Sequence, residues 1–229
     1  MRPRIVLRKW IAACCLLLLG CVCASAQATA PCGGDFGAWL QGVKTEAAAQ
    51  GISQRAIQSG LGGITPDPAV IARDHAQGVF RQSFEQFSGR MIPPRLARGA
   101  KMLAQYGPTF SKIEQQYGVP GAIIVAIWGL ETDFGAGNGN FATIRSLVSL
   151  AYDCRRPDKF RGEIFAALKI VDRGDMAPAD MHGAWAGEIG QTQFLPSSYL
   201  KFAVEASTSG TEWRRSTLPL PSKSTPYLM

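Results

Sequence analysis

The sequence predicts a mainly α-helical fold, and three observations lead to this. From Asp35 onward, apolar residues recur at three- and four-residue spacing, which is the period of an amphipathic helix. Glycine and proline interrupt this period at short intervals, where turns between helices are expected. No long run alternates apolar with polar residues, so no substantial sheet is expected.

The first expected helices are marked by their breaks. Gly51 ends an apolar pattern that begins at Phe36, and Ser53 stands where it would cap the next helix. The proline-containing stretches at residues 65–68 and 92–94 predict turns.

Longer helical patterns follow in the middle of the chain. Residues 94–118 predict a long amphipathic helix, or a pair of helices bent near Gly107. Pro120 then occupies the favoured first-turn position of another helix. Two more helices are expected over residues 144–152 and 160–171.

The two ends of the chain do not share this pattern. Residues 1–26 have a basic start, an apolar run of 14 residues and the small-residue end Ala24-Ser25-Ala26, which together indicate a secretory signal peptide. The run is shorter than the ~20 residues of a membrane span, which favours a cleaved signal over a membrane anchor. A lipobox-like Leu-Leu-Gly-Cys leaves a lipid anchor at Cys21 as the alternative form. Residues 206–229 have neither a helical nor a strand period and are expected to form a disordered tail.

Charge and composition exclude some classes of protein. The net charge is +7, but loss of residues 1–26 removes four of the 24 basic residues and none of the 17 acidic ones, which leaves +3. Such a balance argues against a nucleic-acid-binding protein. With 46% apolar and 18% charged residues, the chain has the composition of a packed globule.

The cysteine count predicts one disulfide. Four of the six cysteines lie inside the expected signal, so only Cys32 and Cys154 remain. In an oxidising compartment two remaining cysteines favour a Cys32–Cys154 bond, with two separate buried thiols as the alternative. No metal site is expected, because His75 and His182 are far apart and have no ligand spacing around them.

Glu131 is the most informative single residue. On a helix it lies one turn after Ile127, which predicts that the carboxylate is aligned with the buried apolar face. Burial there would raise the pKa of a carboxyl group and suit it to proton donation. The alternatives are a glutamate turned to solvent or paired with an arginine. Asp133 faces another direction, so the two acids are not an obvious catalytic pair.

A second cluster spans residues 183–199 and combines glycines, two glutamines and aromatic residues. Rings stack on sugar faces and amides bind hydroxyl and acetamido groups, which favours a sugar-binding surface. The alternative is a glycine-rich turn that packs for its own sake. Glu188 within it is either a second acid or a solvated loop charge.

Three motifs in this order resemble those of the membrane-bound lytic transglycosylase B family, which cleaves bacterial peptidoglycan: Tyr-Gly-Val-Pro at 117–120, Glu-Thr-Asp-Phe-Gly at 131–135 and Gly-Glu-Ile-Gly-Gln-Thr-Gln-Phe-Leu-Pro-Ser-Ser-Tyr at 187–199. The resemblance covers about residues 36–204. It implies a lysozyme-like helical fold of the goose-lysozyme type, a periplasmic location, peptidoglycan glycan strands as the partner and no cofactor.

The resemblance also implies roles for single residues. Glu131 occupies the position of the family's lone acid/base, which protonates the glycosidic oxygen after N-acetylmuramic acid and then deprotonates the C6 hydroxyl. The product is a 1,6-anhydro sugar, and no water is consumed. The residues that correspond to substrate contacts are Gln191, Gln193, Arg155, Arg156 and Tyr199.

The chain departs from the family pattern at two places. Ala184 stands where many members have serine, and the resemblance stops after Glu205. Residues 27–205 are therefore expected to form an incomplete catalytic domain. A catalytically inactive peptidoglycan-binding remnant is the alternative function.

Overall fold

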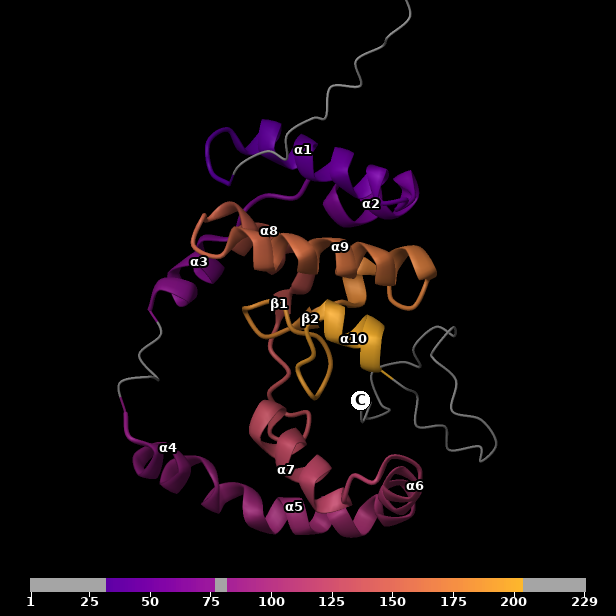
Figure 1. Ribbon diagram of the computed structural model, residues 1–229. Helices are drawn as coiled ribbons and strands as arrows, with labels where there is room; N and C mark the ends of the chain where they lie inside the picture. The colour runs from indigo at the N-terminus through magenta and orange to yellow at the C-terminus, as the bar shows by residue number, and fades with distance from the viewer. Residues whose placement is uncertain (1–31, 77–81, 204–229) are drawn as a thin grey trace, which may run out of the picture.

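The computed structural model describes residues 32–76 and 82–203, and this part of the chain is mainly helical, as predicted (Figure 1). The predicted signal (1–26) and tail (206–229) lie outside these residues. The helices are α1 (Phe36–Ala49), α2 (Gln54–Leu61), α3 (Pro68–His75), α4 (Phe84–Met91), α5 (Pro93–Gln105), α6 (Gly107–Tyr117), α7 (Gly121–Thr132), α8 (Thr143–Tyr152), α9 (Pro157–Arg173) and α10 (Pro196–Phe202).

The larger hydrophobic core lies among α1, α2, α8 and α9 (Figure 1). α8 is buried along most of its length and packs on α9, while α1 and α2 cover α9 from another side. Ser53 accepts a hydrogen bond from the backbone N–H of Ala56, which confirms that it caps α2. The fully buried side chains include Leu61, Leu147, Leu150, Phe160, Ile164 and Leu168.

A smaller core lies among α5, α6 and α7. The predicted pair of helices is confirmed, because α5 ends at Gln105 and α6 begins at Gly107. Gly121 lets α7 approach α6 closely, since a Cβ at that position would lie 2.6 Å from the Cβ of Phe110. This core consists of Phe110, Ile113, Val125, Trp128 and Phe134.

Extended structure is limited to short pieces in the described residues. β1 (Phe141–Ala142) pairs with β2 (His182–Gly183) in antiparallel register, and Ile189 forms a bridge with Phe194. These contacts shape the segment between β2 and α10, residues 184–195. No substantial sheet was expected, and none is present in residues 32–76 and 82–203.

α10 is anchored on α9 by a buried acid. Glu163 accepts hydrogen bonds from the backbone N–H of Ser197 (2.8 Å) and from its hydroxyl (2.6 Å). Ser197 belongs to the first turn of α10, and the N-cap residue Leu195 provides no side-chain acceptor. The carboxylate of Glu163 therefore supplies the missing cap and fixes the end of the 184–195 segment.

The predicted disulfide is confirmed. Cys32 is bonded to Cys154, and their Cα atoms are 5.1 Å apart. The bond joins the residues before α1 to the turn between α8 and α9, where the backbone N–H of Gly33 also donates to the carbonyl of Tyr152 (3.0 Å). Within the two described ranges, no helix combines the length and the apolarity needed to cross a membrane.

Candidate active site

Glu131 lies in the last turn of α7, on a face opposite to the one predicted. The apolar stripe that precedes it is exposed, with Ile123 at 53% and Ile127 at 47% exposure. The prediction that Glu131 follows the buried face is therefore wrong. The buried face consists of Gly121, Val125, Trp128, Gly129 and Thr132.

Small residues explain why α7 buries that other face. A Cβ at Gly129 would lie 2.7 Å from the ring of Phe134, so only glycine allows this ring to pack against the helix. Glu131 is left on the accessible side, and its side chain as a whole is exposed. Neighbouring groups still withdraw part of the carboxyl from water, and this burial raises its pKa above the usual value.

The residues after Glu131 tie α7 to the 184–195 segment. Thr132 donates from its hydroxyl to the backbone carbonyl of Gln191 (2.6 Å) and accepts from the N–H of Gly135 (3.1 Å). Trp128 donates from its indole N–H to the side-chain oxygen of Gln191 (2.7 Å). Gln191 therefore holds the two segments together at the site.

Asp133 takes part in a separate charge cluster. It is the C-cap of α7, with a left-handed φ of 51°. Its carboxylate lies 3.7 Å from Arg95 Nε and 4.0 Å from the Arg98 guanidinium, both on α5. The side chain of Arg95 also donates to the carbonyl of Gly129 (2.7 Å). Asp133 therefore neutralises α5 arginines and does not form a pair with Glu131.

Glu188 is not a solvated loop charge. Its Oε2 atom is buried and has no hydrogen-bond partner among the described residues. Burial raises the pKa of this carboxyl, and the negative charge of Glu131 raises it further, against the opposing effects of backbone hydrogen bonds and Lys159. Two carboxyl groups that are 57 positions apart in sequence therefore influence each other electrostatically.

Gln193 is engaged with the backbone on both sides of its amide. Its side-chain oxygen accepts from the N–H of Ala184 (3.0 Å), and its NH₂ donates to the carbonyls of Gly190 (2.7 Å) and Asn138 (3.3 Å). In this conformation the amide shapes the 184–195 segment. Its contact with substrate stays a prediction.

Arg155 and Arg156 are bound to an acid that the sequence did not reveal. Asp74 on α3 is only 1% exposed and forms ion pairs with both guanidinium groups, at 2.8 Å for Arg155. The arginines thereby fasten α3 to the turn before α9. Substrate contact through them stays a prediction, as it does for Tyr199, which is 4% exposed and packs in the larger core.

The same region contains a group of potential metal ligands. Asp74, His75 and Asp153 each place one ligand atom within 4.8 Å of the others. The ion pairs with Arg155 and Arg156 already occupy both oxygens of Asp74, and His75 Nε2 lies 2.8 Å from the carboxylate of Asp153. The arrangement is that of an ion-pair network.

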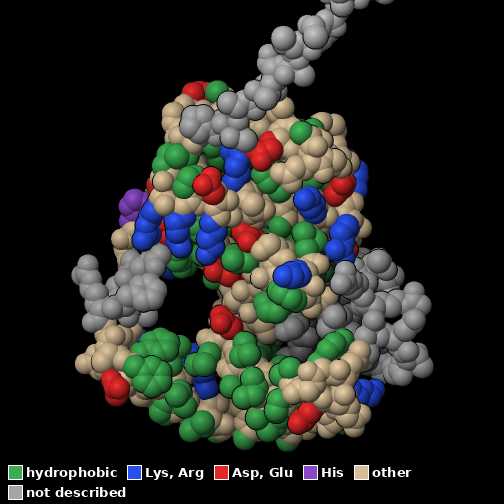
Figure 2. Space-filling view, viewed as in Figure 1, with side chains coloured by type: hydrophobic (Ala, Val, Ile, Leu, Met, Phe, Trp, Pro, Cys, Tyr) green, Lys and Arg blue, Asp and Glu red, His purple; other side chains and the backbone are tan. Residues whose placement is uncertain are grey.

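The space-filling view shows a hollow between two parts of the molecule. Figure 2 shows an opening between the larger core and the α4–α7 layer, with Asp and Glu side chains at its edge and Lys and Arg side chains above it. The C-terminal end of α7 and the 184–195 segment meet between these two layers (Figure 1).

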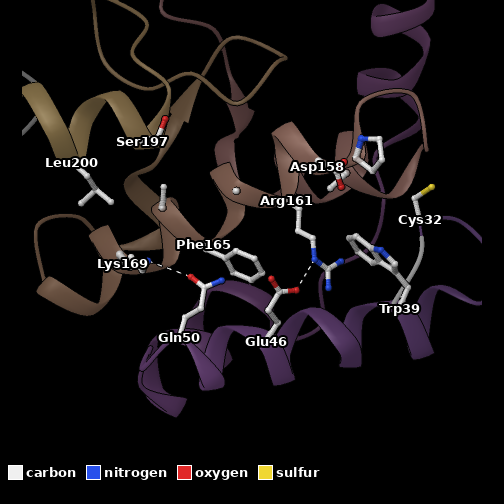
Figure 3. A pocket seen from close by; sticks show the side chains of 14 residues that line it. Cys32, Trp39, Glu46, Gln50, Asp158, Arg161, Phe165, Lys169, Ser197 and Leu200 are labelled. Carbon is white, nitrogen blue, oxygen red and sulfur yellow. Dashed lines mark hydrogen bonds and ion pairs between the residues drawn. The ribbon is translucent and has the colours of Figure 1, made fainter. Parts of the chain in front are cut away.

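A separate pocket of about 840 Å³ lies between α1, α9 and α10 (Figure 3). Figure 3 shows that Arg161 pairs with Glu46 there, at 2.7 Å, and that Lys169 donates to Gln50. Of the predicted site residues, only Cys32 lines this pocket. The candidate active site is therefore the carboxyl-bearing region around Glu131.

Comparison with known proteins identifies the family. Residues 35–214 match the model of the transglycosylase SLT domain. The chain belongs to this family. The chain is 34% identical over 121 residues to membrane-bound lytic murein transglycosylase B of Escherichia coli strain K12, over 52% of this chain and 34% of that protein.

Solved structures of similar proteins support the expected lytic-transglycosylase fold. SltB3 from Pseudomonas aeruginosa, solved in complex with NAG-NAM-pentapeptide, matches with a TM-score of 0.69 and 36% identity over 78% of this chain and 48% of that chain. Escherichia coli Slt35, solved in complex with bulgecin A, matches with a TM-score of 0.66 and 29% identity over 79% of this chain and 60% of that chain. The chain thus spans 34–60% of the length of these three relatives.

Proposed function

We propose that this SLT-domain protein is a peptidoglycan lytic transglycosylase in which Glu131 is the general acid and base. The observation that carries the proposal is the accessible carboxyl of Glu131, within the family motif, with a pKa raised by burial. A raised pKa keeps a larger fraction of the carboxyl protonated at a given pH, as proton donation requires. The ligand in the SltB3 complex is a NAG-NAM peptide, which supports a glycan strand as substrate.

The reaction needs only one carboxyl that acts twice. Glu131 donates its proton to the glycosidic oxygen between N-acetylmuramic acid and N-acetylglucosamine, and the bond from C1 to that oxygen breaks. The Glu131 carboxylate then takes the proton of the C6 hydroxyl, and the C6 oxygen bonds to C1. The acid is regenerated, and the sugar becomes a 1,6-anhydro ring without consuming water. Two-carboxylate glycosidases instead add water to the same position.

Digestion of purified sacculi tests the proposal. We expect the protein to release 1,6-anhydro muropeptides, measured by mass spectrometry of the soluble products, and the Glu131→Gln variant to lose this release because its amide cannot donate the acid proton. Glu114→Gln, an exposed glutamate on α6, is the charge-matched control and should retain activity.

Two other outcomes would replace the proposal. Products that carry free reducing ends would indicate a hydrolase. Sedimentation with sacculi without any released product would indicate a non-catalytic peptidoglycan-binding protein. The second outcome corresponds to the alternative function derived from the sequence.

A further inference from the structure

Gln191 is contacted by residues on both sides of Glu131 along the chain. Trp128, three residues before Glu131, donates from its indole N–H to the side-chain oxygen of Gln191 (2.7 Å). Thr132, the residue after Glu131, donates to the backbone carbonyl of Gln191 (2.6 Å). Gly135 has a left-handed φ of 82°, and a Cβ there would lie 2.6 Å from the same side-chain oxygen. The segment that carries Glu131 therefore packs against Gln191 both before and after the acid.

The donor of the side-chain bond is held in place by the smaller core. Trp128 is only 2% exposed, and its ring packs edge-on against Tyr106 (5.7 Å between ring centroids) and Phe134 (5.6 Å). An indole N–H can only donate, so the amide of Gln191 presents its oxygen and not its NH₂ to Trp128. The bond therefore fixes both the position and the orientation of this amide.

The acceptor is held from the other side by a tight loop. Ile189 and Phe194 exchange two backbone hydrogen bonds, of 2.8 and 3.0 Å, and thereby close the loop between them. Gln193 has a left-handed φ of 52°, and its side-chain NH₂ donates to the carbonyl of Gly190 (2.7 Å) within this loop. Gln191 belongs to the same loop and therefore has little freedom to move away from α7.

We propose that Gln191 and Trp128 form a positioning pair that sets the place of the Glu131 carboxyl relative to a bound glycan. The proposal deepens the proposed function and rests on it for its catalytic consequence. One carboxyl must reach the glycosidic oxygen and then the C6 hydroxyl, so a small displacement of the end of α7 slows the chemical step. Gln191 acts here through the position of Glu131, which differs from the substrate contact that the resemblance implies for it.

Kinetics on soluble glycan strands prepared from sacculi separate positioning from substrate contact. Gln191→Met keeps a side chain of similar length but offers no oxygen to the indole, and Trp128→Phe removes the donor. We expect each variant to lower kcat by about 10- to 100-fold with little change in KM. The double variant should lose little more than either single variant, because both changes remove the same bond.

Two kinetic outcomes would overturn the proposal. A higher KM at unchanged kcat in Gln191→Met would make Gln191 a substrate contact. Unchanged kcat and KM, after correction for the folded fraction measured by circular dichroism, would reduce the pair to a structural contact. Gln115→Met, at an exposed glutamine on α6, is the matched control and should leave both constants unchanged.

The indole N–H of Trp128 provides a readout that does not need activity. Its NMR signal in the full chain is assigned by its loss in Trp128→Phe. We expect this proton to exchange with deuterium about 10-fold or more faster in Gln191→Met than in the wild type, because its acceptor is gone. Slow exchange in the wild type without any product from sacculi would refute the proposed function but not the contact. Equal exchange rates in the two proteins would refute the pair even if product is formed.

Discussion

Thr132 is the residue after the candidate acid and connects the end of α7 to the 184–195 segment, so its substitution should weaken this connection. Thr132→Val keeps the shape of the side chain but removes the hydroxyl that bonds Gln191 and Gly135. Buried polar groups left without partners cost about 1–3 kcal/mol. We expect a loss of this size in the free energy of unfolding, measured by urea denaturation, whereas Thr132→Ser should lose less. Equal stabilities of the valine variant and the wild type would contradict this role.

Glu188 should make the stability of the protein depend on pH. Its pKa in the folded state lies above the ordinary value of 4.5, so its contribution is fully present below that pH and is lost as the pH rises through the folded pKa. Glu188→Gln removes this loss. We therefore expect the free energy of unfolding, measured in urea at a series of pH values from below 4.5 upward, to decline less in the variant than in the wild type. Parallel curves would show that Glu188 ionises as freely in the folded chain as in the unfolded one.

The sequence could identify Glu131 but could not place it. Its motif was recognisable, yet α7 is apolar on nearly every side, so the spacing of Ile123 and Ile127 did not decide which face is buried. Glycines at the contacts with Phe110 and Phe134 decided it, through close approach of segments distant in sequence. Asp74 was unrecognisable for the same reason, and the sequence could not decide whether Glu188 is buried or solvated, since their burial depends on tertiary contacts.

At the scale of elements, β2 requires glycine where it passes behind Glu188. Alanine at position 183 would place its Cβ 1.8 Å from a backbone oxygen, and backbone cannot yield as a flexible side chain does. We expect Gly183→Ala to lower the free energy of unfolding by about 1–3 kcal/mol or more and to displace the 184–195 segment. Urea denaturation measures the loss, and chemical shifts of the segment report the displacement.

Gly162 on α9 is the matched control for that substitution. It is an exposed glycine inside a helix, and a Cβ there meets nothing within 4 Å. Gly162→Ala should therefore raise the free energy of unfolding by about 0.5–1 kcal/mol, because alanine loses less conformational entropy in a helix. A loss of stability in this variant would show that the helix is constrained by contacts that the structure does not contain.

Element boundaries were the part of the fold that the sequence predicted best. Ser53 caps α2 as expected, and the break near Gly107 separates α5 from α6, because capping and turn formation depend on residues close in sequence. The turn expected at residues 92–94 is only a one-residue break, since α4 ends at Met91 and α5 begins at Pro93. Proline suits the first turn of α5, and it therefore starts a helix there.

At the scale of the whole molecule, the disulfide closes a loop that contains most of the described fold. Cys32 and Cys154 are 122 positions apart. A cross-link of this length restricts the unfolded chain, and removing a native disulfide costs about 2–5 kcal/mol. We expect the free energy of unfolding of the Cys32→Ser/Cys154→Ser variant to be lower by an amount in this range, so that the variant unfolds at a lower guanidinium concentration. Dithiothreitol should shift the unfolding midpoint of the wild type toward that of the variant and leave the midpoint of the variant unchanged.

The chain belongs to the family of its relatives but spans only part of their length, so the chemistry of its products decides its function. SLT-domain membership is shown by residues 35–214, while the chain spans 34–60% of the length of the three relatives compared. The features of this chain itself that support the proposed reaction are the accessible carboxyl of Glu131 and its raised pKa.

The most direct measurement is the mass of muropeptides released from sacculi in water enriched in oxygen-18. Intramolecular closure by the C6 oxygen predicts products that are lighter than the reducing muropeptides by one water and contain no heavy oxygen, with none formed by Glu131→Gln. Products that contain heavy oxygen at C1, or equal release by the glutamine variant, would contradict the assignment of Glu131 as the acid and base of a lytic transglycosylase.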